Sequence, residues 1–234
     1  MHVDKLIDIK KTALGIGLLF LLCCASCSNP FPSLSGLNAV QITTYNIQTF
    51  FDAVTTGLEY DDFKGSKSSW SEEKYKIRLA RLCSMLEFLD SDIFVFQEIE
   101  NEQILQDISN NLKIQADASR SFSYAVFVPS RDKTLGCAVL SRFPILSCSS
   151  HAVDIRRPAV SPPDMRPLLE VSVDCGFSFP VTVFAGHWKS KAGSDEHSGF
   201  WRSAQEAVLA SRISLFPEGY FIFCGDCNKD ISEF

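Results

Sequence analysis

Several short apolar runs of the sequence each end in a polar side chain that could bind a metal ion or act as an acid or base. These side chains are Asn46, Glu98, His187 and Asp226, and Asn228 follows two residues after the last of them. A carboxylate at the carboxyl end of a buried strand is held rigidly at a sheet edge where ligands bind. Hard divalent cations prefer carboxylate and amide oxygens. Glu98 is therefore the expected metal ligand, with Asn46 either supplying a carbonyl oxygen or orienting Glu98.

The other three polar residues suit a hydrolytic reaction. An imidazole at His187 can donate a hydrogen bond to a phosphoryl oxygen or protonate a leaving group. Asp226 can accept a proton from water, Asn228 can hold a phosphate oxygen, and Gly225 permits a close backbone turn before them. Taken alone, each of these residues is more often a cap, turn or structural residue. The interpretation therefore depends on their occurring together.

The polar residues lie in five blocks that follow one another in a fixed order. The blocks are TTYNIQTFFD, FVFQEIEN, GCAVLSRFPI, AGHWKSKAG and FCGDCN, and they extend over nearly all of residues 40–228. In content and order they resemble the endonuclease/exonuclease/phosphatase superfamily, which has the DNase-I-like fold. The resemblance implies an α+β protein: a four-layer α/β/β/α sandwich of two mostly antiparallel or mixed sheets flanked by helices. It also implies metal-dependent phosphoester hydrolysis with Mg²⁺ or Mn²⁺.

The resemblance assigns a role to each candidate residue. It makes Glu98 the principal metal ligand and Asn46 its companion. It makes His187 the hydrogen-bond donor to the phosphate or leaving group, and it makes Asp226 and Asn228 the pair that positions the nucleophilic water and the phosphate. The block HWKSK is more typical of nuclease-like members, so nucleic acid is the expected substrate. A phospholipid or a sugar phosphate is the alternative.

Two features depart from the family pattern. Family members continue beyond the G-D-x-N block to a closing Ser-Asp-His motif that helps to activate water, and this sequence contains no Ser-Asp-His. We therefore expect the domain to miss its last strands and this chain to be inactive alone. A separately encoded C-terminal part could complete it, or the domain could be a catalytically dead surface binding module. In addition, no acidic partner for His187 is evident, and Asp132 is the candidate.

Hydrophobic periodicity predicts the elements that must position these residues. Ser71 is a suitable N-cap for a helix whose apolar residues recur from Tyr75 to Leu89 at spacings of three and four. Further helices are predicted at 102–114 and 200–215. Strands are predicted at 40–45, 93–96, 122–128, 136–141, 168–173, 181–185 and 220–224. This mixture favours stacked sheets with helices outside rather than a regular alternating parallel sheet.

The first 38 residues have the composition of a targeting segment. Three lysines precede an uncharged apolar run at 13–22, which is typical of a secretion signal and too short to span a bilayer. The run LLCCASC resembles a bacterial lipoprotein signal with Cys27 as the lipid-bearing residue, although Cys24 stands where Leu is usual. We therefore expect a signal peptide at 1–26, a tether at 27–38 and a partial domain at 39–234. The chain would be an exported, membrane-anchored lipoprotein, periplasmic or on the cell surface; a cleaved signal without an anchor is the alternative.

Charge argues against a protein that reads DNA sequence. Residues 1–26 hold three of the 22 basic and two of the 28 acidic residues, so the remainder has 19 and 26, a net charge of −7. A protein without a global basic field can still be an enzyme with a local basic rim around a cation. Candidates for that rim, with exposed solvated charge as the alternative, are Arg142, Arg166, Lys189 and Lys191.

Cysteine usage leaves a second type of site open. Cys224 and Cys227 form a C-x-x-C pair, as in redox and zinc sites, but no second pair of metal-binding type accompanies them. The irregular spacing of the remaining cysteines does not indicate a disulfide framework.

Overall fold

A computed structural model describes residues 39–65, 68–115, 121–154, 163–191, 195–216, 218–230 and 232, without the side chains of 113–115 and 195–197. The predicted signal peptide, Cys27 and the tether up to residue 38 lie outside these residues. Residues 40–234 form one structural unit, to which the following description refers.

The first of two sheets carries Asn46 and Glu98. Its strand order is β1-β2-β4-β3, with β1 (Ile42–Phe50) parallel to β2 (Ile93–Ile99). β4 (Gly136–Ser141) runs antiparallel to both β2 and β3 (Tyr124–Pro129). The central strands β2 and β4 are almost entirely buried, as expected for the uninterrupted apolar run that precedes Glu98.

The second sheet carries His187 and Asp226. Its strand order is β5-β6-β7-β8, where β5 is Ile145–His151, β6 is Leu168–Val173, β7 is Val181–His187 and β8 is Tyr220–Asp226. Only β7 and β8 pair in parallel; the other pairs are antiparallel. Both sheets are therefore mixed.

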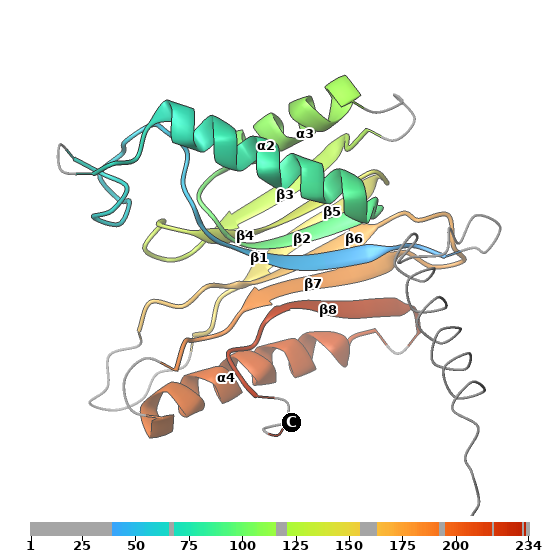
Figure 1. Cartoon of the computed structure of the whole chain (residues 1–234). Coiled ribbons are helices and arrows are strands. Elements are labelled where there is room, and N and C mark those ends of the chain that lie inside the picture. Colours follow the sequence, from blue (N-terminus) through green and yellow to red (C-terminus); the bar gives the residue numbers. More distant parts are fainter. Residues whose placement is uncertain are drawn as a thin grey trace, which may run out of the picture. The chain divides into compact units, whose positions relative to one another are not determined.

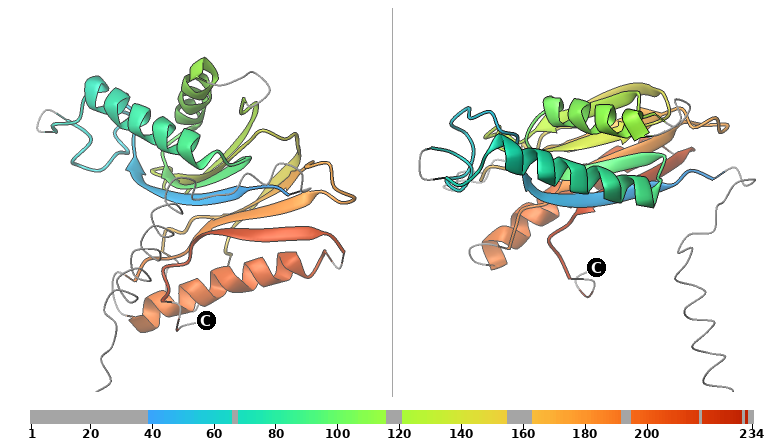
Figure 2. Two further views of the ribbon diagram at one scale, coloured as in Figure 1. Left: turned by 45° about the vertical axis from the view of Figure 1, so that its right-hand side comes forward. Right: turned by 45° about the horizontal axis from the view of Figure 1, so that its top comes forward.

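Helices cover the outer faces of the two sheets (Figures 1 and 2). α2 (Glu72–Leu89) and α3 (Glu102–Gln115) lie on the first sheet, and α4 (Asp195–Ile213) lies on the second. Side chains of β2 alternate accordingly: Phe94 and Phe96 face the helices, whereas Ile93 and Val95 face the second sheet. The predicted α/β/β/α sandwich is thus confirmed.

The helix α2 shows how the sequence specifies its ends. Ser71 Oγ accepts a hydrogen bond from the N–H of Lys74 at 3.3 Å, and Glu72 and Glu73 occupy the first turn, where the helix dipole favours negative charge. The helix ends at Asp90, whose left-handed backbone (φ 49°) lets its N–H reach the carbonyl of Leu86. The predicted cap and apolar face are both confirmed.

One strand was not predicted from the sequence. β5 has the sequence ILSCSSH, its residues are mostly exposed, and it pairs only with β6. Its serines give it no apolar alternation, so only the pairing with β6 defines it as a strand. Within the described residues, no helix is long and apolar enough to cross a membrane.

A charged cluster joins three elements of the second half. Glu170 of β6 accepts hydrogen bonds from Arg212 of α4 at 2.8 and 3.2 Å, and it lies 2.8 Å from His151 Nε2 of β5. Burial alone would raise the pKa of Glu170, but the hydrogen bonds and charges of Arg212 and His151 outweigh it and lower the pKa. The ionised carboxylate therefore stabilises the fold at neutral pH.

We expect Glu170→Gln to lower the free energy of unfolding at pH 7 by about 1–2 kcal/mol, because the amide loses the charge-assisted bonds. A carboxyl with a lowered folded pKa stabilises the protein above its unfolded pKa, and this stabilisation disappears as pH falls through the folded value. Thermal unfolding should therefore separate wild type from variant at pH 7 and bring them together near pH 3. Glu218→Gln, an exposed control outside the helices, should change stability little. An equal difference at both pH values would contradict this account.

Candidate active site

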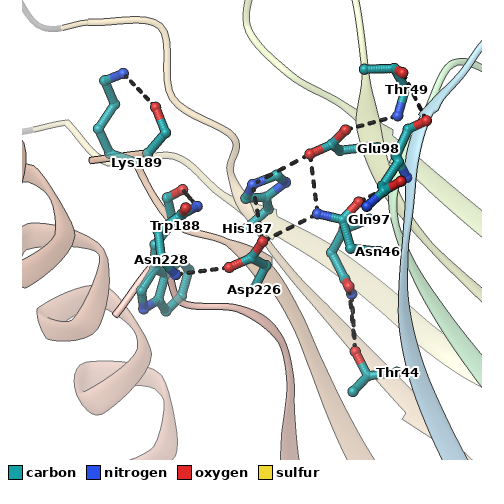
Figure 3. A network of polar contacts seen from close by, with 12 residues as sticks. Thr44, Asn46, Thr49, Gln97, Glu98, His187, Trp188, Lys189, Asp226 and Asn228 are labelled. Carbon is teal, nitrogen blue, oxygen red and sulfur yellow. Dashed lines mark hydrogen bonds and ion pairs between the residues drawn. The ribbon is translucent and has the colours of Figure 1, made fainter. Parts of the chain in front are cut away.

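Polar side chains from both sheets meet at the carboxyl ends of β1, β2, β7 and β8 (Figure 3). Asn46 Nδ2 donates to Glu98 Oε1 at 3.1 Å and to Asp226 Oδ2 at 3.2 Å. His187 Nε2 lies 3.9 Å from each of the same two carboxylate oxygens. Four residues that are far apart in the sequence thus surround one point between the sheets.

Glu98 is aimed at this point by an irregularity of the sheet. The pairing of β2 with both β1 and β4 shifts register around Glu98, whose φ is 64°. A bulge of this kind re-aims a side chain, and a non-glycine residue in the left-handed region indicates strain that the surroundings must hold. The N–H of Thr49 binds Glu98 Oε2 at 2.8 Å, so both carboxylate oxygens are fixed.

Arg78 of α2 holds the turn that presents this N–H. Its guanidinium donates to the carbonyls of Ile47 and Thr49 at 3.0 Å each, and also to that of Gln48. Gln48 and Thr49 have φ values of 54° and 52°, so both are held in the left-handed conformation. The Arg78 guanidinium also stacks over the Phe50 ring at 4.7 Å. Arg78 therefore fixes the orientation of Glu98 through a backbone turn.

His187 is the most buried member of the site, with 4% of its surface exposed. Burial is the largest cause that lowers its pKa, to about 4, and the charge of Arg166 adds to the lowering, whereas Asp226 and Glu98 oppose it. The imidazole is therefore neutral at pH 7, with Nε2 facing the two carboxylates.

The predicted partner of His187 was wrong. Asp132 accepts bonds instead from Ser130 Oγ and from the N–H of Thr134. His187 Nδ1 is buried and has no hydrogen-bond partner within the described part of the chain. The acidic groups that do lie near the imidazole are Glu98 and Asp226.

Asn228 ties together the segments that leave β7 and β8. Its Nδ2 donates to the carbonyl of Trp188 at 3.0 Å, and its backbone N–H donates to Asp226 Oδ1 at 2.9 Å. The N–H of Trp188 in turn donates to the carbonyl of Asp226 at 2.8 Å. Asn228 thus reaches the site through Asp226, and its predicted contact with phosphate stays a prediction.

Gly225 is required for close packing rather than for a turn. It lies within β8, opposite Gly186 of β7, without a positive φ. A Cβ atom on Gly225 would lie 2.1 Å from the Gly186 carbonyl oxygen, a distance no real contact allows. The glycine therefore lets β8 approach β7 closely enough to bring Asp226 beside His187.

Some supporting residues could not have been selected from the sequence. Gln205 of α4 is 1% exposed and accepts a bond from the Lys189 N–H at 2.7 Å, while its Nε2 contacts the carbonyls of His187 and Arg166, both at 3.4 Å. The signal in the sequence that could have indicated Gln205 is a polar amide on the helix face that otherwise carries apolar residues. Thr49 and Arg78 act through backbone atoms, which leave no pattern in the sequence.

Two of the four candidates for the basic rim form ion pairs, and the other two line a cavity beside the active site. Arg142 binds Asp90 at 2.9 Å and its N–H donates to Asp92, at the opposite end of β2 from Glu98, so its assignment to the rim was wrong. Lys191 pairs with Asp230 at 2.8 Å. Arg166 and Lys189 both line a polar cavity beside the site.

The C-x-x-C pair does not have the character of a redox site. Cys224 and Cys227 are both free thiols, and Cys224 is buried. Burial raises the pKa of the Cys224 thiol to about 11, whereas reactive and metal-binding thiols have lowered values. Among the described residues, no group of three or more His, Cys, Asp or Glu side chains is arranged to hold a metal ion.

The residues at the centre do fit a hard divalent ion that keeps part of its water. Mg²⁺ is usually bound through one or two carboxylates and several waters, not by a full protein cage. Glu98 Oε1 and Asp226 Oδ2 both lie within hydrogen-bond distance of one neutral amide nitrogen, which leaves their charge largely uncompensated. Asn46 Oδ1 accepts from the Gln48 N–H at 2.9 Å, so the amide orients Glu98, the second of its two expected roles.

We expect Arg78→Met to weaken Mn²⁺ binding about tenfold, because Glu98 loses its fixed orientation. Binding is measured by electron paramagnetic resonance on protein shown by circular dichroism to be folded. Arg78→Lys should lose less, and Arg81→Met, an exposed position of the same helix, should bind Mn²⁺ like wild type. A lower melting temperature with unchanged Mn²⁺ affinity would restrict Arg78 to a structural role.

Solved structures of similar fold extend well beyond this chain. The similar structures include TDP2 from C. elegans, with 16% identity and a TM-score of 0.55, covering 83% of this chain and 49% of that one. Beta toxin from Staphylococcus aureus, as a beta hairpin deletion mutant, has 14% identity and a TM-score of 0.59, covering 83% and 69%. The human Nocturnin catalytic domain has 16% identity and a TM-score of 0.54, covering 82% and 66%. At these identities the likeness shows the fold alone.

Sequence comparison gives the family. No curated protein matches the chain. The sequence model of the Endonuclease/Exonuclease/phosphatase family matches residues 41–232, which is most of the chain and contains every candidate active-site residue. The family generally uses divalent metal ions. The chain therefore belongs to the endonuclease/exonuclease/phosphatase family of metal-dependent phosphodiesterases and phosphatases.

Proposed function

We propose that the domain is an exported nuclease that hydrolyses phosphodiester bonds with Mg²⁺ or Mn²⁺. The observation that carries the proposal is the convergence of Glu98, Asp226 and His187 around the amide of Asn46. Glu98 would be the principal metal ligand, with Asn46 as the companion that orients it and Asp226 Oδ2 beside the ion. A bound divalent ion would polarise a phosphoryl oxygen and offset the charge that develops on it.

The protein side chains supply the other parts of the reaction. His187 is neutral at pH 7, so its Nε2–H can donate to a phosphoryl oxygen without a counter-charge. Asp226 is 36% exposed at its side chain, so water can reach it, and the Asn228 N–H holds its other oxygen in place. Asp226 can therefore orient a water and accept its proton.

The proposal includes a second polypeptide part that completes the site. Within the described residues, β1 and β8 each pair with one strand only and form the adjoining edges of the two sheets. A groove of about 450 Å³ opens there, with Asn46 and Asp226 in its wall, and Phe221 and Ile222 of β8 are exposed. Unpaired edges with exposed apolar side chains favour added strands.

Export and lipidation complete the proposal. They rest on the apolar run at 13–22 and on Cys27 behind small residues. An exported, anchored nuclease would act on nucleic acid outside the cytoplasm. Because the domain carries a net negative charge, a local basic site would be needed to attract the anionic substrate.

A binding module without catalysis is the second candidate. The same open edges of β1 and β8 favour it, because a partner strand could bind there without any reaction. The Asn228 amide, which is engaged with the Trp188 carbonyl, also fits a structural use of the site.

One preparation tests location and activity together. Cells expressing the chain, alone or with any polypeptide encoded directly downstream, are fractionated, and each fraction is incubated with supercoiled plasmid, RNA and a phospholipid in the presence of Mg²⁺. We expect the chain in the membrane fraction, little cleavage by the chain alone, and nicking of plasmid by the completed protein. Glu98→Ala should abolish that nicking, and Cys27→Ser should release the chain from the membrane.

The outcomes separate the candidates. Cleavage by the chain alone that depends on Glu98 would show that the added part is dispensable. Hydrolysis of the phospholipid but not of nucleic acid would replace the nuclease by a phospholipid phosphoesterase. A completed protein that cleaves none of the three substrates, yet melts cooperatively, would support the binding module instead.

A further inference from the structure

A second, polar cavity lies next to the candidate active site. It encloses about 150 Å³ and is lined by the β3–β4 loop, by the segment that enters β6 and by the residues that follow His187. Its wall includes Tyr60, Ser130, Asp132, Arg166, Lys189 and Ser190. A water occupies about 30 Å³ in the liquid, so the cavity has room for roughly five waters or for one phosphate group. The catalytic residues themselves are absent from its wall, which makes it distinct from the groove beside Asn46.

Two cationic side chains of this wall form no ion pair with any residue that the structure describes, although the pKa of Asp132, which burial alone would raise, is lowered by the hydrogen bonds to that carboxylate and, after them, by the charge of Arg166. Arg166 forms no ion pair with any described residue, and its buried Nε has no hydrogen-bond partner. Among the described residues, Lys189 Nζ donates a hydrogen bond to the Ser190 hydroxyl, at 3.5 Å; Figure 3 shows the Lys189 side chain beside the active site. Buried polar atoms are normally satisfied, so an unpaired guanidinium nitrogen beside an open cavity indicates a missing acceptor.

The acidic residues of the wall do not supply that acceptor. Asp132 and Asp164 are exposed to solvent, whereas Arg166 and Lys189 are partly buried. Asp132 Oδ1 is also engaged by Ser130 and by the Thr134 N–H. The positive charges of Arg166 and Lys189 are therefore less hydrated than the negative charges of the wall, and they dominate inside the cavity.

The cavity is coupled to the active site by structure. Gln205 contacts the carbonyl of Arg166, the carbonyl of His187 and the N–H of Lys189, so one buried amide holds together the backbone segments that carry both cations and the imidazole.

We propose that this cavity binds a second phosphate of the substrate, adjacent to the one that is hydrolysed, with Arg166 and Lys189 as its charged contacts. The proposal rests on the proposed function and narrows its substrate class. A nucleic-acid strand carries a phosphate at every nucleotide, so a neighbouring phosphate is always available. A phosphodiester with a cationic head group would instead place like charges together.

The test compares two ligands that differ by one phosphate. Thymidine 3′,5′-bisphosphate and thymidine 5′-phosphate are titrated into the full chain with Mn²⁺ by isothermal calorimetry. We expect wild type to bind the bisphosphate about tenfold more tightly, because charge-assisted bonds are among the strong ones. Arg166→Met and Lys189→Met should each reduce this ratio to about threefold or less. Lys76→Met, an exposed lysine on α2, serves as the control and should keep the ratio.

Failure of the subsite is distinguishable from failure of the proposed function. Equal affinity of wild type for the two ligands, with binding that still depends on Glu98, would overturn the subsite alone. A ratio that survives both substitutions would also overturn it. Absence of any Mn²⁺-dependent binding of either ligand would overturn the proposed function as well. Because the two substitutions lie in different segments, misfolding of one variant still leaves the other as a test.

Discussion

A single amide group joins the two halves of the domain at the point where chemistry is expected. Asn46 belongs to the first sheet, and its Nδ2 donates both to Glu98 of the same sheet and to Asp226 of the second. Two carboxylates held this close repel each other, and a neutral amide compensates only part of that repulsion. A divalent cation bound there would compensate the rest and would stabilise this arrangement.

The backbone around this amide adopts strained conformations that other residues hold in place. Gln48, Thr49, Glu98 and Asn228 all have positive φ values, although none is a glycine. Such conformations are unfavourable and persist only where the surroundings fix them. Arg78 fixes Gln48 and Thr49 by donating to their backbone carbonyls. The side chain of Asn228 is fixed by its hydrogen bond to the carbonyl of Trp188. The close contact of Gly225 with Gly186 sets the distance between the segments that carry Asp226 and His187.

The sequence predicts elements with a strong local signal. Ser71 and the apolar repeat after it define α2, and the short apolar runs before Glu98 and Asp226 define β2 and β8. The Ser-rich β5 lacks such a signal, and its pairing with β6 defines it instead. In the site, residue type does not separate Arg142 from Arg166: one pairs with Asp90 at the far end of β2, the other lines a cavity beside His187. Only the register of the folded sheets makes that distinction.

The central claim is that Glu98 binds a divalent ion and that Asp226, beside it, contributes to the same site. It is tested most directly by counting Mn²⁺ sites in wild type, Glu98→Gln, Asp226→Asn and the double variant by electron paramagnetic resonance. We expect one site in wild type, a loss of affinity of at least tenfold in each single variant, and no further loss in the double variant, since neighbours on one ligand are not additive. Two sites, each removed by only one of the substitutions, would contradict the claim.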